Sequence, residues 1–296
     1  MVAATRSSVR RRRDVGNAVA ASGCDDAEIA KGEIEDRGKL LPVQWKTLLR
    51  IAAALVVFGG IAETISPTAY GRFGGKGFPI DPRLGWWLME APCTFVFIYS
   101  FWIRGGSQSK SLVPRILAVV FCGHYLYRGW IFPLSIRVYG NTKNFSLPTA
   151  IMAWIVTTVH AELNARWYGS RGKHLNNAWL RSARFWIGLA LYYSGLAMLV
   201  WHDNIMRNLR PCPNGARYCI PHGGLFDYAT AAHYFVELWT WTGFAILSWG
   251  PNGLFILCMS LANLVTRAYR THMWYEDKFG AAYTDLDRKN LIPFVW

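Results

Sequence analysis

The sequence predicts an all-α membrane protein with seven transmembrane helices and a polar loop between helices five and six. Hydrophobic residues make up 52% of the 296 residues, whereas charged residues make up only 17%. Several apolar runs reach the length of about 20 residues that a membrane-spanning helix requires. Between two of these runs lies the stretch 202–241, which begins as a loop dense in proline, glycine and arginine and then enters the next apolar run.

The apolar runs define the predicted spans. Gly250, Pro251 and Gly253 predict a tight hairpin between the last two spans. An odd number of spans places the two termini on opposite sides, but Lys and Arg occur on both sides, so the orientation stays open. The predicted spans are Thr47–Ser66, Gly85–Arg104, Leu112–Leu134, Leu147–Trp167, Arg184–His202, Ala229–Trp249 and Asn252–Ala268.

The chain divides into a tail, residues 1–45, and one membrane domain, residues 46–296. The tail carries the basic run SVRRRRD and the acidic stretch CDDAEIAKGEIED without the apolar core of a signal peptide, so we expect it to be disordered. The net charge of +14 would suggest nucleic acid in a soluble protein, but here the aromatic residues lie inside the apolar runs. We therefore expect no nucleic-acid partner and assign the positive charge to membrane lipids and a phosphorylated ligand.

The cysteines give no sign of a metal site, because no CxxC or CxxH spacing occurs. Cys212 and Cys219 lie in the polar loop and could form a bridge. We expect free thiols there, since the loop should face a reducing cytosol. His233 and Glu237 have the spacing of a metal pair, but no further ligand stands at a convincing distance, so we expect no metal.

Glu90 is the most informative single residue. It lies in GWWLMEAPCTFVFIYSFW, and a carboxyl group inside a membrane is costly enough to suggest function. Its apolar surroundings favour the neutral acid, which can donate a hydrogen bond; the alternative is a structural pairing with an arginine such as Arg128. Tyr125, in FCGHYLYRGW, could donate to a carbonyl oxygen or be an interfacial aromatic residue.

Two polar clusters could contact an anionic ligand. His233, Glu237 and Trp241 repeat at i, i+4 and i+8 and therefore share one helix face beside the glycine-rich loop. A second cluster, beyond the last span, could contact the same ligand or lie among lipid headgroups; its members are Arg267, His272 and Tyr275.

Four motifs together resemble the steroid 5α-reductase family: YCIPHGGLFDY, AAHYFVELWTWTGFA, RAYRTHMWYEDKF and the terminal DRKNLIPFVW. The resemblance extends back through HDNIMRNLR, HYLYRGWIFPL and WWLMEAP to AYG, and so covers the chain from Tyr70 to the C-terminus. It implies a multi-pass membrane reductase, in the endoplasmic reticulum membrane of a eukaryote. Such enzymes use NADPH to saturate a carbon–carbon double bond conjugated to a ketone. We expect a monomer that takes a steroid or other lipid from the bilayer.

The resemblance also assigns roles by position. Glu90 and Tyr125 match the pair that holds the substrate carbonyl oxygen. Leu199, His233 and Thr271 depart from the family pattern and leave the substrate open. The positions expected to bind NADPH are Tyr70, Asp203, Arg210, Tyr218, His233, Glu237, Trp241, Arg267, His272 and Tyr275.

Three other functions stay open. The chain could reduce another lipid, such as polyprenol, a different sterol or an enoyl thioester. It could be an isoprenylcysteine-type membrane methyltransferase, although the Glu90 and Tyr125 pair and the GGLFDY loop argue against this. It could also be a lipid receptor without activity, which the number of inward polar residues disfavours.

Overall fold

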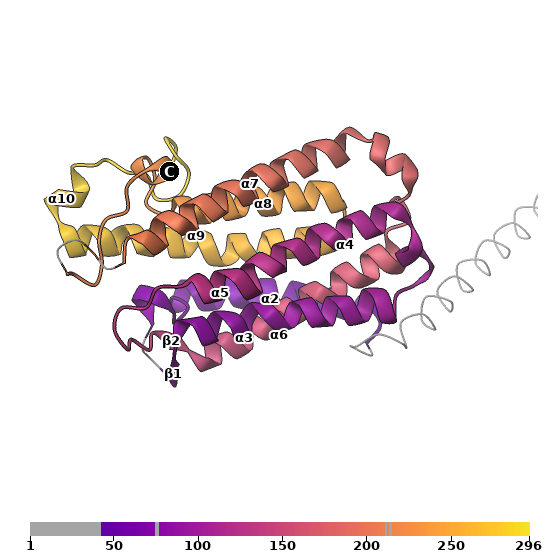
Figure 1. Ribbon diagram of the computed structural model, residues 1–296, viewed down its shortest axis with the longest axis horizontal. Coiled ribbons are helices and arrows are strands. Elements are labelled where there is room, and N and C mark those ends of the chain that lie inside the picture. The colour runs from indigo at the N-terminus through magenta and orange to yellow at the C-terminus, as the bar shows by residue number, and fades with distance from the viewer. Residues whose placement is uncertain (1–42, 75–76, 211, 213–214) are drawn as a thin grey trace, which may run out of the picture.

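The computed structural model describes residues 43–296 except 75–76, 211 and 213–214. The predicted tail lies outside the described residues, apart from residues 43–45. Long helices run side by side along the longest axis of the molecule (Figure 1). The elements are α2 (Trp45–Ile65), β1 (Pro79–Ile80), α3 (Pro82–Ile98), α4 (Leu112–Tyr125), α5 (Phe132–Ser135), β2 (Phe145–Ser146), α6 (Leu147–Arg166), α7 (Ala183–Asn208), α8 (Ala232–Ser248), α9 (Pro251–Phe279) and α10 (Ala281–Thr284).

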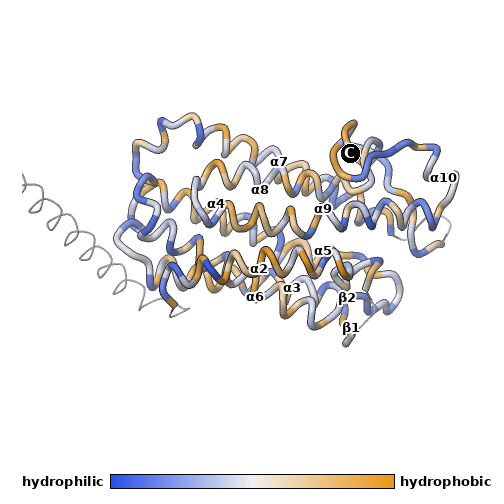
Figure 2. Tube along the Cα trace, turned by 180° about the vertical axis from the view of Figure 1, so that it is seen from behind, coloured by the Kyte–Doolittle hydropathy of each residue, from blue (hydrophilic) through white to orange (hydrophobic). Residues whose placement is uncertain are grey.

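The predicted all-α class is confirmed, because β1 and β2 are the only strands in the described part of the chain. Each predicted span coincides with a helix or with two helices in line. Two helices, α2 and α7, are long and apolar enough to cross a membrane by length and composition. The hydrophilic stretches gather toward the two ends of the bundle (Figure 2).

Two helices continue past the predicted spans. α7 runs to Asn208, beyond the predicted end at His202, and α9 runs to Phe279, beyond the predicted end at Ala268. The polar stretch after Ala268 contains neither glycine nor proline, so nothing interrupts the helix until Gly280, whose φ of 54° ends it. The extension carries His272 and Tyr275 beyond the bundle, toward the C-terminal segment.

The backbones of α7 and α8 approach closely because glycines line their contact. A Cβ atom on Gly188 would lie 2.5 Å from the backbone nitrogen of Leu247, and one on Gly243 would lie 2.4 Å from that of Tyr192. Small residues allow this kind of approach in membrane helices. The packing places Asp203, near the end of α7, in the same region as Glu237 of α8.

Wide helical turns follow α3, α4 and α6, at residues 99–103, 126–131 and 167–171. The turn after α4 presses against α3, since a Cβ atom on Gly129 would lie 2.9 Å from the Cα atom of Ala91. This contact brings Arg128, next to Gly129, to the level of Glu90. Wide turns of this kind are frequent at functional sites.

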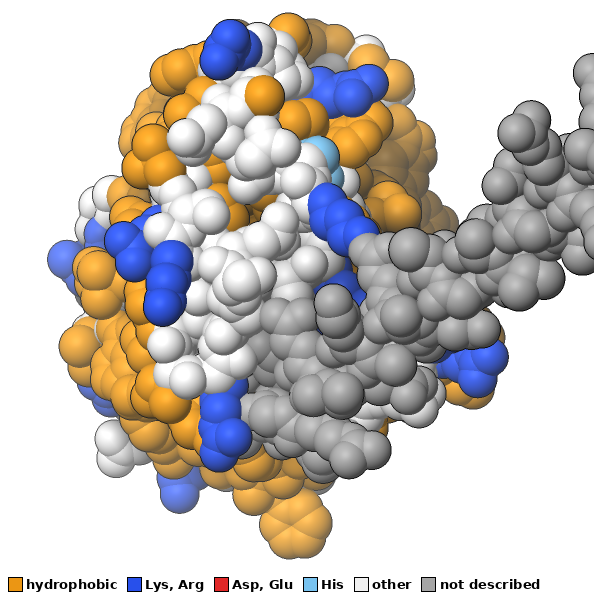
Figure 3. Space-filling model, turned by 90° about the vertical axis from the view of Figure 1, so that its right-hand side faces the viewer, with side chains coloured by type: hydrophobic (Ala, Val, Ile, Leu, Met, Phe, Trp, Pro, Cys, Tyr) orange, Lys and Arg blue, Asp and Glu red, His pale blue; other side chains and the backbone are white. Residues whose placement is uncertain are grey.

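The two ends of the bundle differ. At one end, an aromatic core fills the space between α3, α4 and α6, with the rings of Phe97 and Phe121 only 4.3 Å apart. Among the described residues, the surface of that end shows Lys and Arg side chains and no Asp or Glu in the view of Figure 3. At the other end, β1 pairs antiparallel with β2, with Ile80 opposite Phe145, and the loops enclose a cavity.

Candidate functional site

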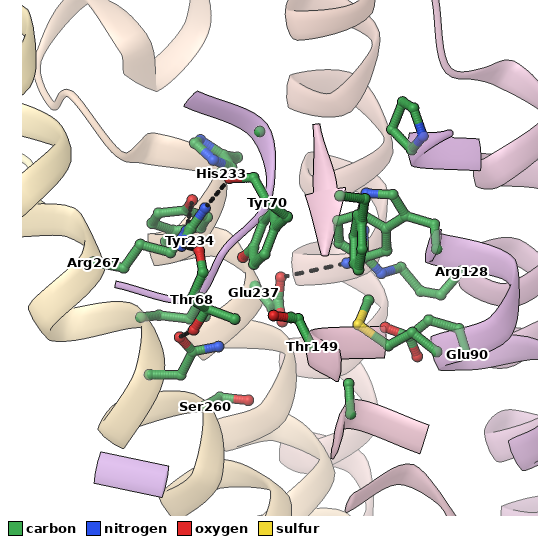
Figure 4. A pocket seen from close by; sticks show the side chains of 18 of the residues that line it. Thr68, Tyr70, Glu90, Arg128, Thr149, His233, Tyr234, Glu237, Ser260 and Arg267 are labelled. Carbon is green, nitrogen blue, oxygen red and sulfur yellow. Dashed lines mark hydrogen bonds and ion pairs between the residues drawn. The ribbon is translucent and has the colours of Figure 1, made fainter. Parts of the chain in front are cut away.

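A cavity of about 740 Å³ opens among α2, α3, α6, α7, α8 and α9 and the loop after α2. Most of the predicted site residues line it, and Figure 4 shows several of them from close by. Four do not: Tyr125, Trp241, His272 and Tyr275. The structure brings the other eight predicted site residues together in the cavity wall: Glu90, Tyr70, Asp203, Arg210, Tyr218, His233, Glu237 and Arg267.

Arg128 is the central charge of the cavity wall. Its Nη1 lies 3.6 Å from Oδ2 of Asp203, and its Nη2 lies 3.9 Å from Oε2 of Glu237. The guanidinium plane covers the ring of Trp86 at 4.7 Å, and Tyr127 donates a hydrogen bond of 3.0 Å to Asp203. These ion pairs are longer than a direct hydrogen bond, so both carboxylates keep acceptor capacity toward the cavity.

Glu90 lines the cavity beside this network. The charges of Arg128 and Glu237 act on its carboxyl group, yet Arg128 forms its ion pairs with Asp203 and Glu237 instead. The purely structural pairing that the sequence left open, Glu90 with Arg128, is therefore absent among the described residues at ion-pair distance. The carboxyl group of Glu90 is placed where a ligand in the cavity could contact it (Figure 4).

Tyr125 lies behind the cavity wall. Its side chain is buried, and its hydroxyl group forms a hydrogen bond of 2.8 Å with Nδ1 of His160 on α6. It therefore shares the aromatic core with Phe121 rather than facing the cavity. Its predicted contact with a substrate carbonyl stays a prediction.

Arg267 organises the loop after α2. Its Nη1 and Nη2 donate to the carbonyl oxygens of Thr68 at 2.8 Å and Tyr70 at 3.0 Å, and its Nε donates to the hydroxyl of Tyr234 at 2.9 Å. The ring of Tyr70 lies against the guanidinium group at 3.7 Å. Arg267 thus shapes the cavity by holding this loop, with much of its donor capacity already in use.

A group of arginines stands at the loop end of the cavity. Arg72, Arg207 and Arg210 line it, and no ion pair joins any of them to a carboxylate in the described part of the chain. Burial lowers the pKa of Arg210, and the nearby charges of Arg72 and Arg217 lower it further. Mutual repulsion of this kind would be relieved by a bound anion.

Buried polar atoms without partners mark the same region. Nη1 of Arg72, Nδ1 of His233 and Oδ1 of Asn144 are buried and have no hydrogen-bond partner among the described residues. Arg72 is otherwise held between the rings of Trp274 and Tyr275, at 4.7 and 4.5 Å. Unsatisfied buried groups are costly unless a ligand completes them.

His233, Glu237 and Trp241 share one face of α8, but only the first two line the cavity. His233 and Glu237 line the cavity, as predicted from their spacing. Trp241 lies one turn deeper, 4.4 Å from the ring of His124. It supports the wall from behind and does not face the cavity.

His272 and Tyr275 connect α9 to the C-terminal segment instead of contacting the cavity. Nδ1 of His272 bonds to Thr230 at 2.7 Å and to Tyr283 at 2.9 Å. Tyr275 accepts a hydrogen bond of 3.3 Å from Arg72. Both residues can therefore influence the site only indirectly, through partners such as Arg72 and Thr230.

The expectation of free thiols in the polar loop was wrong: the structure joins Cys212 to Cys219 by a disulfide bond. The two sulfur atoms meet because the chain turns back at Gly215, whose φ is 72°. Tyr218 lies within the bridged segment, next to Cys219, and Arg210 lies just before it; both line the cavity.

Sequence reasoning missed several residues of the cavity wall, among them two charged ones, Glu63 and Arg72. Glu63 lies at the end of α2, and its single carboxyl group in an apolar run was the available signal. Arg72 gave no signal on its own, because its loop is separated from the other arginines by more than a hundred residues in sequence. Among the described residues, no three His, Cys, Asp or Glu side chains gather to hold a metal ion.

Comparison with known proteins decides the family. A profile of 3-oxo-5-alpha-steroid 4-dehydrogenase matches residues 143–296. The chain belongs to this family. It is 34% identical to the steroid 5-alpha-reductase of Solanum lycopersicum over 221 residues, which are 75% of this chain and 84% of that protein. It is 34% identical to 3-oxo-5-alpha-steroid 4-dehydrogenase 1 of Rattus norvegicus over 244 residues, 82% of this chain and 91% of that one. The human 3-oxo-5-alpha-steroid 4-dehydrogenase 1 is 32% identical over 250 residues, 84% of this chain and 93% of that protein.

Membership in the 3-oxo-5-alpha-steroid 4-dehydrogenase family makes the chain an oxidoreductase that acts on CH–CH groups. The family resemblance predicted from the C-terminal motifs is thereby confirmed. The sequence left a reductase and a membrane methyltransferase open, and family membership supports the reductase.

Proposed function

We propose that this protein reduces the carbon–carbon double bond of a 3-oxo-Δ4 steroid or a similar enone lipid with NADPH. The observation that carries the proposal is one continuous cavity with two kinds of wall. Its loop end carries Arg72, Arg207 and Arg210, whereas its side walls carry apolar groups such as Phe58, Met152 and Met259. Glu90 lies in this same cavity, where an apolar substrate and an anionic cofactor would meet.

The loop end fits a phosphorylated cofactor. Guanidinium groups bind phosphate oxygens well, and those of Arg72 and Arg210 lack carboxylate partners among the described residues. The buried Nη1 of Arg72 and Nδ1 of His233 have no partner within the described chain and could bond to such a ligand. NADPH would supply the hydride. Tyr218 also lines the cavity, with the guanidinium groups of Arg210 and Arg217 near its ring.

The residues around Glu90 supply the activation of the substrate. A neutral carboxyl group at Glu90 would donate a hydrogen bond to the ketone oxygen and withdraw electrons from the conjugated double bond. The β carbon would then become the electrophilic position. The network of Arg128, Asp203 and Glu237 fixes the electrostatic surroundings, so the site needs little rearrangement during reaction.

The walls support a lipid substrate. Phe58 of α2 and Met152 of α6 line the cavity, and their side chains are 69% and 55% exposed. In a bilayer, these side chains would meet acyl chains. We propose a multi-pass membrane protein, in the endoplasmic reticulum membrane if the source is eukaryotic, that works as a monomer and admits its substrate from the lipid phase.

The experiment is a reduction assay on membranes that contain this protein. Membranes are incubated with NADPH or NADH and one of three probes: a 3-oxo-Δ4 steroid, a polyprenal or an enoyl thioester. Mass spectrometry follows the gain of two hydrogen atoms. We expect reduction of the steroid with NADPH, far less with NADH, and far slower reduction in membranes carrying Glu90→Ala. Reduction of the thioester or the polyprenal alone, or equal rates with both cofactors, would contradict the proposal.

A further inference from the structure

Glu63 is a buried carboxylate for which the proposed reaction has no use. Its side chain is 3% exposed, and it lies in α2, a helix apolar enough to cross a membrane. A carboxyl group in such a segment is costly and therefore suggests a function. Glu63 lines the cavity, so that function belongs to the site.

The protein uses only part of the hydrogen-bonding capacity of Glu63. Its Oε2 accepts from the backbone nitrogen of Thr68 at 2.8 Å and from the hydroxyl group of Thr68. Its Oε1 has no hydrogen-bond partner among the described residues, and Nη1 of Arg267 lies 4.0 Å away. That nitrogen already donates to the carbonyl oxygen of Thr68 at 2.8 Å. One carboxylate oxygen is thus left to a ligand.

Other polar groups accompany Glu63 on the same wall. Ser260 and Asn263 of α9 line the cavity, and Oδ1 of Asn263 lies 3.5 Å from the hydroxyl group of Thr68. Figure 4 places Thr68 and Ser260 on the opposite side of the cavity from Glu90 and Arg128. A purely apolar substrate would leave these groups unsatisfied, at a cost that a polar substituent would remove.

We infer that the wall formed by Glu63, Ser260 and Asn263 recognises a second polar group of the substrate, a hydroxyl at the end away from the reduced enone. The inference rests on the proposed function and narrows its substrate class to hydroxylated enone lipids. A carboxylate only accepts hydrogen bonds, so it favours a hydroxyl donor and repels a carbonyl oxygen at the same place. Sites built around such a bond reject analogues that lack the donor.

Two probes that differ only at the far end test this inference. One is a 4-androstene with a 3-ketone and a 17β-hydroxyl, and the other carries a 17-ketone instead. We expect kcat/KM to favour the hydroxyl probe in the unmodified enzyme. Glu63→Gln should lower that preference roughly tenfold or more, because an amide can donate to the ketone and a bond to a charged group is lost. Asn263→Leu should lower the preference in the same direction.

Two control variants separate recognition from structure. Thr149→Val removes a polar group from another wall of the cavity and should leave the preference unchanged. Thr68→Val removes the hydrogen bond from the Thr68 hydroxyl group to Glu63, which anchors the loop after α2. Any loss of kcat/KM in this variant should be the same for both probes. Thermal unfolding in detergent shows whether each variant is folded.

The outcomes distinguish this inference from the proposed function. Equal kcat/KM for the two probes in the unmodified enzyme would overturn the inference while leaving steroid reduction intact. The same would follow if Glu63→Gln slowed both probes equally and Thr68→Val copied it, since Glu63 would then be an anchor of the loop. Reduction of neither probe would instead count against the proposed function itself.

Discussion

Two buried clusters of charge in this bundle have different roles. In α6, Nε of Arg166 lies 2.9 Å from Oε1 of Glu162, with both side chains fully buried. Ser100 donates to the other oxygen at 2.6 Å, and Nη1 of Arg166 donates to the carbonyl of Val43 at 2.7 Å. In the cavity, by contrast, Arg128 stands 3.6 and 3.9 Å from its two carboxylates.

The difference shows how to distinguish a structural charge from a functional one in an apolar bundle. In the Glu162 cluster, the charged groups find their hydrogen-bond and ion-pair partners within the protein. The cluster holds the segment before α2 against α6. The Arg128 cluster is loosely paired, lines a cavity, and stands near Arg210 and His233. Buried charges are tolerated when they are well paired, so loose pairing beside a cavity indicates that a ligand completes the set.

The largest effect on stability should follow from breaking the tight cluster. Glu162→Ala leaves Arg166 buried without its carboxylate, and removing one partner of a buried pair costs about 3–5 kcal/mol. We expect a clear drop in the melting temperature in detergent and a lower yield of folded protein. Asp203→Ala, the matched change in the loose cluster, should alter the melting temperature far less. If Asp203→Ala were equally destabilising, the distinction between the clusters would be wrong.

The largest effect on turnover should come from Glu90. Losing one donor to a developing oxyanion typically costs on the order of a hundredfold or more in rate, so Glu90→Ala should slow single-turnover reduction by about that much at saturating NADPH. Glu90→Gln keeps a weaker donor and should retain more activity. A variant Glu90→Ala that reduced an enone at the unmodified rate would show that this residue is structural.

Tyr125→Phe tests the partner that the family resemblance assigns to Glu90. Because the hydroxyl group bonds to His160 behind the wall, we expect a smaller loss than that of Glu90→Ala, roughly tenfold, the scale of a single hydrogen bond. Cofactor affinity should stay close to normal. If both groups held one oxygen, the double variant would be little slower than Glu90→Ala alone. Additive losses in the double variant would instead indicate separate roles.

Much of this fold was predictable because apolar runs and glycine or proline breaks mark the helices. Gly250 and Pro251 placed the turn between α8 and α9 correctly. The end of α9 was not predictable from hydropathy, since its last turns are polar and are held by packing of Tyr275 on Phe279 and Tyr283. Hydropathy does not report these ring contacts, of which the one with Tyr283 reaches beyond α9.

The site was predictable where helical spacing or a costly buried charge marked it. Glu90, His233 and Glu237 were found in this way and line the cavity. Arg72 was not, because only the folded loop brings it to Arg210. Trp241 shares the helix face of His233 and Glu237 in the sequence, yet it lies one turn deeper, where the cavity has ended. Helical periodicity predicts which residues share a helix face, but it does not predict how far along the helix a pocket extends.

Cofactor binding should depend on the loosely paired arginines. Arg72→Ala and Arg210→Ala should each raise the KM for NADPH about ten- to a hundredfold, the scale of a hydrogen bond to a charged group. The effect on kcat should be smaller. Arg83→Ala serves as the matched control, since Arg83 is exposed and pairs with Asp81 outside the cavity wall. An unchanged KM in both cavity variants would place the phosphates elsewhere.

The smallest effect should come from the disulfide bond in the polar loop. The bond between Cys212 and Cys219 closes a segment that contains Tyr218 and follows Arg210, and those two residues line the cavity. A loop held in its bound conformation binds with less loss of conformational freedom. Replacing both cysteines with serine should therefore raise the KM for NADPH about threefold, a change on the scale of ordering one side chain, and leave kcat unchanged. Reduction of the unmodified protein should produce the same shift, whereas the double variant should no longer respond to reductant. Intact mass before and after reduction confirms that the bond is present in the sample. A reductant effect of equal size in the double variant would show that the bond does not act on the cofactor site.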